Sequence, residues 1–313
     1  MTGYRRLAAL MMAAFALLTM VTACATRQPS PVPEVPDDPA SAFPAKVSLP
    51  GGEPVTLLQQ PKRIVSLSPS ATETLFALGA GDQVVAVDQF SNHPPNAPRT
   101  ELTGFTSDAA AVASKEPDLV IAPDNATQLA EGLRVVDVPV LLTPSAASLE
   151  DAYQQIQVLG RATGHGNQAR AMVQKMRTTI ADIVARTPKP PQPITYFHEV
   201  SPDLYTATSQ SFVGNVYSLF GMVNIADPAG GPFPQLSQEH VVQANPNLIF
   251  AADTKCCGVN AEAIAARPGW GDIDAVRRNN VVELDDDVAS RWGPRVVDLV
   301  RAISEAVGKA QRG

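Results

Sequence analysis

The chain has 313 residues, of which 45% are hydrophobic, 18% charged and 5% aromatic, and its net charge is −7. This composition excludes an intrinsically disordered chain, a collagen and a polytopic membrane protein. The acidic balance argues against a nucleic-acid partner, because binding to phosphates requires clustered Lys and Arg, and the sequence has no such cluster. The length suffices for one large packed core or for two of ordinary size.

The first 23 residues have the pattern of an export signal. Arg5 and Arg6 precede an apolar stretch, residues 7–21, that is short for a membrane-spanning helix. The stretch ends in Val-Thr-Ala-Cys, which resembles the bacterial lipobox, where the cysteine receives a diacylglyceryl group before cleavage on its amino side. We therefore expect residues 1–23 to be a lipoprotein signal peptide and Cys24 to anchor the chain to the outer face of the cell membrane. The alternative is an ordinary signal peptide with a chance cysteine.

Residues 24–46 are expected to form a proline-rich tether. They contain six prolines and few large apolar side chains. A polyproline-like segment of this length would reach roughly 60–70 Å at about 3 Å per residue. Its role would be to hold the folded part clear of the membrane surface.

Alternating strand and helix patterns predict an α/β lobe over residues 47–147. The run Arg63–Ser68 is typical of a short buried strand, and the helix expected after it ends at Gly79, since glycine allows a left-handed stop. Ser70 is the expected N-cap of this helix, and Glu73 would complete a capping box. Further apolar strands are expected at residues 84–87, 118–122 and 138–142, an arrangement that builds parallel sheets.

An internal repeat predicts a second lobe of the same kind. Residues 111–122 (AVASKEPDLVIA) align without gaps on residues 240–251 (HVVQANPNLIFA). Each segment reads as a helix end, a turn containing proline and an apolar strand. We therefore expect residues 188–313 to form a second α/β lobe.

The segment between the lobes has the pattern of a long helix. Apolar residues recur at helical spacing over residues 149–183, Ser148 is a suitable N-cap, and prolines after residue 187 end the pattern. One helix over residues 148–187 would extend roughly 55 Å; the alternative is two helices with a break at Gly164 and Gly166. The expected fold is therefore two Rossmann-like α/β lobes joined by one long interdomain helix.

Several segments resemble the class III substrate-binding proteins of ABC importers, which collect ferric siderophores, haem and cobalamin. In chain order they are RIVSLSPSATETLFALG, VDQFSNHPP, EPDLVIA, LGRATG, TATSQSFVGNVYSLFGMVNIA, PQLSQEHVVQANPNLIF and RWGPRVVDLV, and together they span nearly all of residues 60–308. The resemblance implies a receptor outside the cytoplasm that captures an iron chelate, a ferric siderophore, and delivers it to an ABC permease and its ATPase. It implies no enzymatic activity and no intrinsic cofactor. Cobalamin and haem are the alternative ligands.

In such a fold the ligand lies between the carboxyl ends of the two sheets, where loops converge. The loops after the expected strands supply the candidate ligand-binding residues Phe90, Phe105, His198, Tyr205, Phe233, Arg291 and Trp292, and also Asp124 and Glu199. Aromatic faces suit a large flat ligand, and arginine pairs with anionic oxygens. The alternative for each aromatic is core packing, and for His198 a satisfied position at a strand end. Trp270 is expected to pack in the core, and Arg295 to brace a helix start.

Docking to the permease is implied to involve acidic side chains on both lobes. Glu239 matches the acidic position of the family in the second lobe. The repeat places Ala110 at the equivalent position of the first lobe, where the family usually has Glu, so Asp108 is the nearest substitute. The alternative for Glu239 is a carboxylate stabilised by the helix dipole.

Three other interpretations are less well supported by the sequence. A receptor for bare zinc or manganese would need a cluster of several His with a carboxylate, and the chain has only four His, so no metal site is expected. A hydrolase would need a nucleophile elbow, an HExxH helix or a similar motif, and none occurs. Cys256 and Cys257 are adjacent and lack the Cys-x-x-Cys spacing of redox proteins; reduced buried thiols, a vicinal disulfide that stiffens a loop, or a redox switch remain open.

Overall fold

The computed structural model describes residues 42–311. The expected signal peptide, Cys24 and most of the expected tether lie outside this range. The described part begins with an antiparallel pair, β1 (Ala45–Val47) and β2 (Val55–Leu57). The predicted end of the tether at residue 46 is therefore wrong, because Ala45 and Val47 on one face of β1 are 1% and 3% exposed and belong to the folded part.

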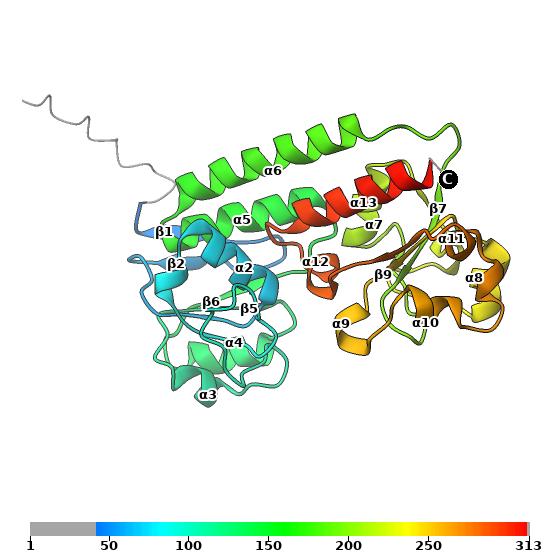
Figure 1. Ribbon diagram of the computed structural model, residues 1–313. Helices are drawn as coiled ribbons and strands as arrows, with labels where there is room; N and C mark the ends of the chain where they lie inside the picture. Colours follow the sequence, from blue (N-terminus) through cyan, green and yellow to red (C-terminus); the bar gives the residue numbers. More distant parts are fainter. Residues whose placement is uncertain (1–41, 312–313) are drawn as a thin grey trace, which may run out of the picture. The chain divides into compact units, whose positions relative to one another are not determined.

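Two four-stranded parallel sheets form the two lobes (Figure 1). In lobe 1 the strand order is β4-β3-β5-β6, and in lobe 2 it is β8-β7-β9-β10, so the first strand of each parallel sheet has the second position in that sheet. The strands are β3 (Ile64–Ser66), β4 (Val84–Val87), β5 (Leu119–Pro123), β6 (Val140–Thr143), β7 (Thr195–Glu199), β8 (Val223–Asn224), β9 (Leu248–Ala251) and β10 (Val281–Glu283). The shared order confirms the prediction of two similar lobes.

Helices connect these strands and cover the sheets. Lobe 1 contains α2 (Pro69–Leu78), α3 (Ala109–Ala113) and α4 (Thr127–Arg134), with the short 3-10 helix η1 (Gly81–Gln83). Lobe 2 contains α7 (Phe212–Ser218), α8 (Gln238–Ala244), α9 (Thr254–Cys257), α10 (Ala261–Ala265), α11 (Asp274–Arg277) and α12 (Asp286–Ser290), with η2 (Asp227–Ala229) and η3 (Trp270–Asp272). The C-terminal helix α13 is Val296–Ala310.

The sequence repeat corresponds to α3 with β5 in lobe 1 and to α8 with β9 in lobe 2. Val112 and Val241 occupy equivalent positions of the two helices, and both are fully buried. The N-caps also correspond: Asp108 accepts a hydrogen bond from Ala111 N (2.7 Å), and Ser237 accepts one from His240 N (3.2 Å). The repeat therefore marks the same packing of a helix on a strand in each lobe.

The start of α2 differs from its prediction. Ser68, not Ser70, is the N-cap and accepts from Ala71 N, while Pro69 occupies the first helical turn, where its missing N–H leaves no bond unmade. Glu73 does not close a capping box, because its carboxylate pairs with two arginines instead. The predicted stop at Gly79 is confirmed, with φ at +90°.

The predicted interdomain helix is two helices, α5 (Leu149–Thr163) and α6 (Gly166–Arg186), which pack side by side (Figure 1). The prediction of one uninterrupted helix over residues 148–187 is wrong because Gly164 adopts φ +78° and ends α5. A Cβ at Gly160 would lie 2.3 Å from that of Ala169, so glycine is needed for the close packing of the two helices. The predicted N-cap is confirmed, since Ser148 forms a capping box with Asp151.

The connection between the lobes is α6, which spans about 30 Å at 1.5 Å per residue. It packs along α5 and α13 and leads through residues 187–194 into β7 (Figure 1). Within residues 42–311, no helix combines the length and the apolar character needed to cross a membrane.

The described residues have three clusters of buried apolar side chains. One cluster contains one face of both sheets, for example Ile64 in lobe 1 and Tyr196 in lobe 2, together with α5, α6 and α13. The opposite faces belong to separate clusters, which contain Val65 in lobe 1 and Phe197 in lobe 2. Because neighbouring residues of a strand face opposite sides, each sheet has one face in a cluster of its own lobe and one face in the core shared by both lobes.

A buried carboxylate adds ion pairs to the contacts of this shared core. Glu73 of α2 is 3% exposed and accepts hydrogen bonds from Arg291 Nη1 (2.8 Å) and from Arg295 Nε (2.9 Å) and Nη2 (2.5 Å). Both arginines lie in the segment that connects α12 to α13. The contact therefore joins lobe 1 to the C-terminal part of the chain, and Arg295 braces the start of α13 as predicted.

Replacing Glu73 is expected to destabilise the fold strongly. The substitution Glu73→Ala leaves two buried or half-buried guanidinium groups without their carboxylate, and we expect it to lower the free energy of unfolding by about 3–5 kcal/mol. Chemical denaturation followed by circular dichroism measures this quantity. A matched control is Glu150→Ala, since the Glu150 side chain pairs with Arg177 but is 69% exposed; its expected cost is below about 1 kcal/mol. Equal costs for the two variants would contradict the assigned role of Glu73.

Candidate functional site

Exposed aromatic side chains lie on the loops at the carboxyl edge of the lobe 1 sheet. Phe90 follows β4 and is 50% exposed, and Phe105 is 70% exposed. The loop that carries Phe105 lies against the strand ends, because a Cβ at Gly104 would come within 2.7 Å of Leu67 O and 2.8 Å of the Pro123 ring. Glycine at position 104 therefore allows the Phe105 loop to pack directly on the ends of β3 and β5.

The equivalent edge of lobe 2 carries Tyr205 and Phe233 on two paired segments. Thr206 N donates to Pro234 O, and Leu236 N donates to Leu204 O, so residues 204–208 and 232–236 run antiparallel. Leu204 and Leu236 face the core, whereas Tyr205 and Phe233 are 46% and 59% exposed. Because side chains alternate along such a pair, the two aromatic rings project from its solvent-facing side.

His198 lies in the core, and its side chain is therefore not accessible to a ligand. Its side chain is 2% exposed, and its Nδ1 lies 2.9 Å from the hydroxyl of Tyr217. Burial lowers the pKa of His198 to about 4. The alternative considered for this residue, a satisfied position at a strand end, is the one observed, because His198 faces the shared core from β7.

Arg291 is buried and Trp292 is half-buried, and each donates a hydrogen bond to an earlier part of the chain. Arg291 is 9% exposed, and besides Glu73 it donates to Phe90 O (3.0 Å) and to Asn92 Oδ1 (2.8 Å). Trp292 Nε1 donates to Gln155 Oε1 of α5 (3.0 Å). The polar groups of both side chains are therefore occupied by protein, which argues against Arg291 as a ligand contact and leaves the role of Trp292 a prediction.

A second polar contact brings loops from the two lobes together at their carboxyl edges. Asn92, close to Phe90 in lobe 1, donates to Asp287 of α12 (3.0 Å). Asp287 also pairs with Arg291 (2.5 Å) and Lys255 (3.3 Å), and Lys255 belongs to the loop after β9. The Phe90 loop of lobe 1 and the β9 loop of lobe 2 are thus connected by a continuous set of hydrogen bonds and ion pairs.

A buried group of charges lies behind this edge in lobe 2. Glu199 is fully buried and forms a two-point ion pair with Arg267, with distances of 2.5 and 2.6 Å. Asp253, after β9, is also fully buried, and neither of its carboxylate oxygens has a hydrogen-bond partner. Burial, together with the neighbouring charge of Glu199, raises the pKa of Asp253 to about 7. Asp253 was not predicted from the sequence, although an acid directly after a fully apolar strand was an available signal.

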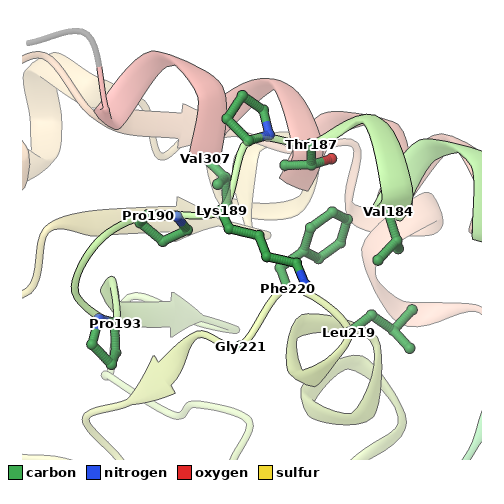
Figure 2. Close-up of a pocket in the computed structure, with 10 residues that line it drawn as sticks. Val184, Thr187, Lys189, Pro190, Pro193, Leu219, Phe220, Gly221 and Val307 are labelled. Atoms are coloured by element: carbon green, nitrogen blue, oxygen red, sulfur yellow. The ribbon is translucent and has the colours of Figure 1, made fainter.

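Two cavities of the described residues lie away from these loops. A cavity of about 380 Å³ is lined by the end of α6, residues 187–193 and the end of α7, at the amino edge of the lobe 2 sheet (Figure 2). Another, of about 620 Å³, is lined by residues 56–61 and by the segments that precede β5 and β6 in lobe 1. Parallel α/β sheets bind ligands at their carboxyl ends. The exposed aromatics therefore define the candidate site better than these cavities do.

The two candidate docking acids occupy different positions in equivalent helices. Glu239 is exposed at the second residue of α8, and Ala110 is at the second residue of α3. Asp108 is exposed, but it is the N-cap of α3, so one of its oxygens already accepts the Ala111 N–H. Residues 42–311 contain no group of three or more His, Cys, Asp or Glu side chains placed to hold a metal ion.

Comparison with known proteins places the fold and the loops in a family. The family described as periplasmic binding protein matches residues 64–288. An uncharacterized ABC transporter substrate-binding lipoprotein of Bacillus subtilis (strain 168), YvrC, is 32% identical over 274 residues, which are 85% of this chain and 86% of that protein. A cobalamin-binding protein of Halobacterium salinarum (strain ATCC 29341 / DSM 671 / R1) is 29% identical over 318 residues, 96% of this chain and 84% of that protein. The solved apo structure of the periplasmic haem-binding protein RhuT from Roseiflexus sp. RS-1 superposes with a TM-score of 0.71 at 27% identity, over 80% of this chain and 99% of that one.

Asp253 is expected to make stability depend on pH. Its pKa is near 4 in an unfolded chain and about 7 in the folded protein, so folding favours the protonated form. The stability that this group contributes is present at low pH and is lost as pH rises from about 4 to 7. We expect Asp253→Asn to be more stable than wild type at pH 8, with an advantage that shrinks toward pH 4.5. Urea unfolding at several pH values tests this, and an advantage that is constant across the range contradicts it.

Proposed function

The chain belongs to the periplasmic binding protein family, as a substrate-binding receptor of an ABC importer, and from this premise we propose that its ligand is a corrinoid of the cobalamin type. The observation that carries the proposal is the set of exposed aromatic side chains on the carboxyl edges of both lobes, Phe90, Phe105, Tyr205 and Phe233. A corrin ring is large and largely apolar on its faces. Aromatic rings on two facing walls bury such a surface efficiently.

The charges on these loops favour a corrinoid over a strongly anionic ferric siderophore. Strongly anionic iron chelates require several free cations. Arg267 and Arg291 already pair with buried Glu199 and Glu73, and Lys255 pairs with Asp285 and Asp287. Arg99, beside the end of β4, stays exposed. This change from the sequence-based order, in which the iron chelate came first, rests on the finding that Arg291 is occupied.

The name of a relative adds support to the proposal. The Halobacterium salinarum protein described above is named as cobalamin-binding, and it matches 96% of this chain. Haem remains the ligand named for the RhuT structure. With His198 buried, Tyr205 is the remaining loop side chain that was considered as an axial ligand to haem iron.

The place of the protein in the cell follows from the family and from its amino terminus. Members of this family act outside the cytoplasm, and we propose that Cys24 carries the lipid anchor, with the proline-rich segment up to about residue 41 as its tether. We further propose that the protein works by binding alone, without an enzymatic activity or an intrinsic cofactor. Its partners would be the permease and ATPase of the importer.

The ligand proposal predicts the outcome of direct titration. Isothermal titration calorimetry of the purified protein with cyanocobalamin, haem and a ferric hydroxamate should give tight binding with cyanocobalamin alone. Tyr205→Ala and Phe105→Ala should each weaken that binding by about 1–2 kcal/mol, or roughly 5- to 30-fold, because each removes a ring that contacts the ligand. Val135→Ala serves as the control, since Val135 is 84% exposed at the amino edge of lobe 1. Tight binding of haem or of the hydroxamate in place of cyanocobalamin would refute the proposed ligand.

Docking is predicted to depend on Glu239 more than on Asp108. With the permease reconstituted in vesicles, Glu239→Lys should reduce stimulation of ATP hydrolysis by on the order of tenfold, because a repulsive charge replaces an attractive one, while ligand affinity stays unchanged. Asp108→Asn, which keeps the N-cap acceptor, should have a smaller effect. Glu262→Lys is a matched control, since Glu262 is the exposed second residue of another short helix, α10. Unaltered stimulation with Glu239→Lys would exclude this residue from the docking surface.

A further inference from the structure

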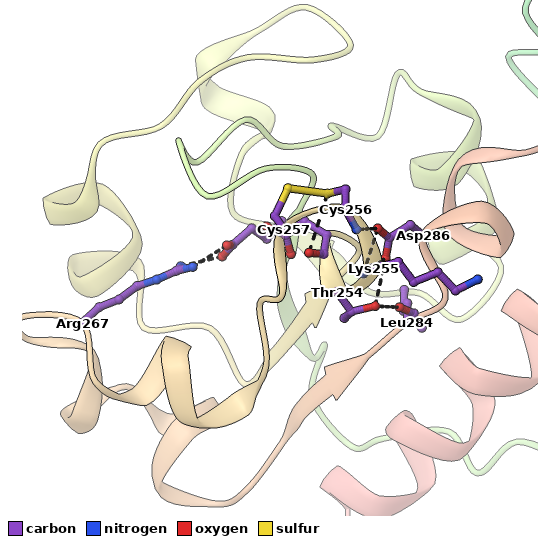
Figure 3. Close-up of a disulfide and its surroundings, with 9 residues drawn as sticks. Thr254, Lys255, Cys256, Cys257, Arg267, Leu284 and Asp286 are labelled. Atoms are coloured by element: carbon purple, nitrogen blue, oxygen red, sulfur yellow. Dashed lines mark hydrogen bonds and ion pairs between the residues drawn. A yellow bond between two sulfur atoms is a disulfide. The ribbon is translucent and has the colours of Figure 1, made fainter. Parts of the chain in front are cut away.

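Cys256 and Cys257 form a disulfide between adjacent residues on α9, in the loop after β9 (Figure 3). Both cysteines are exposed. Of the interpretations left open by the sequence, the structure has the vicinal disulfide. Its function is not explained by the fold, by the docking acids or by the aromatic loops.

This disulfide has no evident role in stability. A bridge between neighbouring residues encloses no stretch of chain, so it restricts the unfolded ensemble very little. It joins no two elements, and neither cysteine belongs to the buried clusters. The disulfide therefore exposes an apolar group to solvent at the carboxyl edge of the lobe 2 sheet, which is the edge where ligands bind in parallel α/β sheets.

The backbone that carries the disulfide is held in place by one side chain. The carboxylate of Asp286 accepts hydrogen bonds from Cys256 N (2.8 Å), Lys255 N (3.0 Å) and Thr254 Oγ1 (2.9 Å), as drawn in Figure 3. Gly258 then ends the short helix with φ +68°. The disulfide is thus presented in a fixed position before any ligand arrives, which lowers the entropic cost of binding.

The loop after β9, which carries the disulfide, lies beside loops of the candidate site. β9 lies beside β7, and Ala252 N donates to Glu199 O (2.9 Å), so the loop begins next to Val200, which is 39% exposed and leads toward Tyr205. On its other side, Lys255 connects through Asp287 to Asn92 in the Phe90 loop of lobe 1. The disulfide therefore lies between loops that carry exposed aromatics in both lobes.

We propose that the Cys256–Cys257 disulfide is part of the ligand-binding wall, where its two sulfur atoms pack against the face of the corrin ring. This inference rests on the proposed function and extends it to residues with no assigned role. Sulfur is apolar and polarizable and makes favourable contacts with conjugated rings. A disulfide also presents two sulfur atoms with less conformational freedom than two free thiol side chains have, because the ring that it closes fixes both.

Two measurements with cyanocobalamin test the inference. In the first, calorimetry compares wild type with the double variant Cys256→Ser/Cys257→Ser, and we expect affinity to fall about 3- to 10-fold with little change in the thermal midpoint. The control is Val135→Ser/Val136→Ser, which likewise replaces two adjacent exposed apolar residues, 84% and 55% exposed, at the amino edge of lobe 1. This control should bind as wild type does.

The second measurement needs no variant. Dithiothreitol reduces the disulfide by two successive thiol–disulfide exchanges and is itself oxidised to a cyclic disulfide. Alkylation and mass spectrometry follow the appearance of the two thiols in wild-type protein, and saturating cyanocobalamin should slow the reduction severalfold by covering the sulfur atoms.

The outcomes separate this inference from the proposed ligand. Affinity of the double variant within twofold of wild type, or a rate of reduction that cyanocobalamin leaves unchanged, overturns the inference while the proposed ligand stands. Wild-type protein that fails to bind cyanocobalamin overturns both.

Discussion

The buried pairing of Glu73 with Arg291 and Arg295 is the interaction on which the arrangement of the site depends. Charges this far from solvent are tolerated only when each has its partners, so the segment between α12 and α13 has few alternative positions against α2. The same Arg291 holds the backbone of Phe90 and the side chain of Asn92. The same contact thus also positions the loop that carries the exposed Phe90.

The shared hydrophobic core joins the two lobes together with these ion pairs. One face of each sheet packs into the same cluster as α5, α6 and α13, so the lobes are joined by packed helices as well as by the chain. Packed helices slide or rotate by small amounts, whereas strands that connect two domains can act as open hinges. A receptor built this way is expected to bind its ligand in a largely preformed site with limited closure, in line with the fixed loop after β9.

Such rigidity gives the loop side chains a larger part in specificity. If the lobes close little, the ligand is selected by the walls that are already present. In the proposed site those walls are the exposed aromatic rings of both lobes and, by the further inference, the disulfide on α9. Relatives with the same fold are named for cobalamin and for haem, so the fold by itself leaves the ligand open and the loops distinguish between them.

The sequence by itself determined the two-lobed α/β fold, its internal repeat, the stop at Gly79 and the cap at Ser148, because apolar periodicity, capping residues and glycine act over a few neighbouring residues. Tertiary structure decided the rest. The sequence left one helix or two open between the lobes, and the two-helix arrangement has Gly160 packed closely against Ala169. Arg291 pairs with Glu73, which lies more than 200 residues earlier in the chain. His198 meets Tyr217 in the core, and the charge of Glu199 is one cause of the raised pKa of Asp253. Contacts of this kind join positions far apart in the chain, and no local pattern of residues specifies which partner a charged or polar side chain will meet.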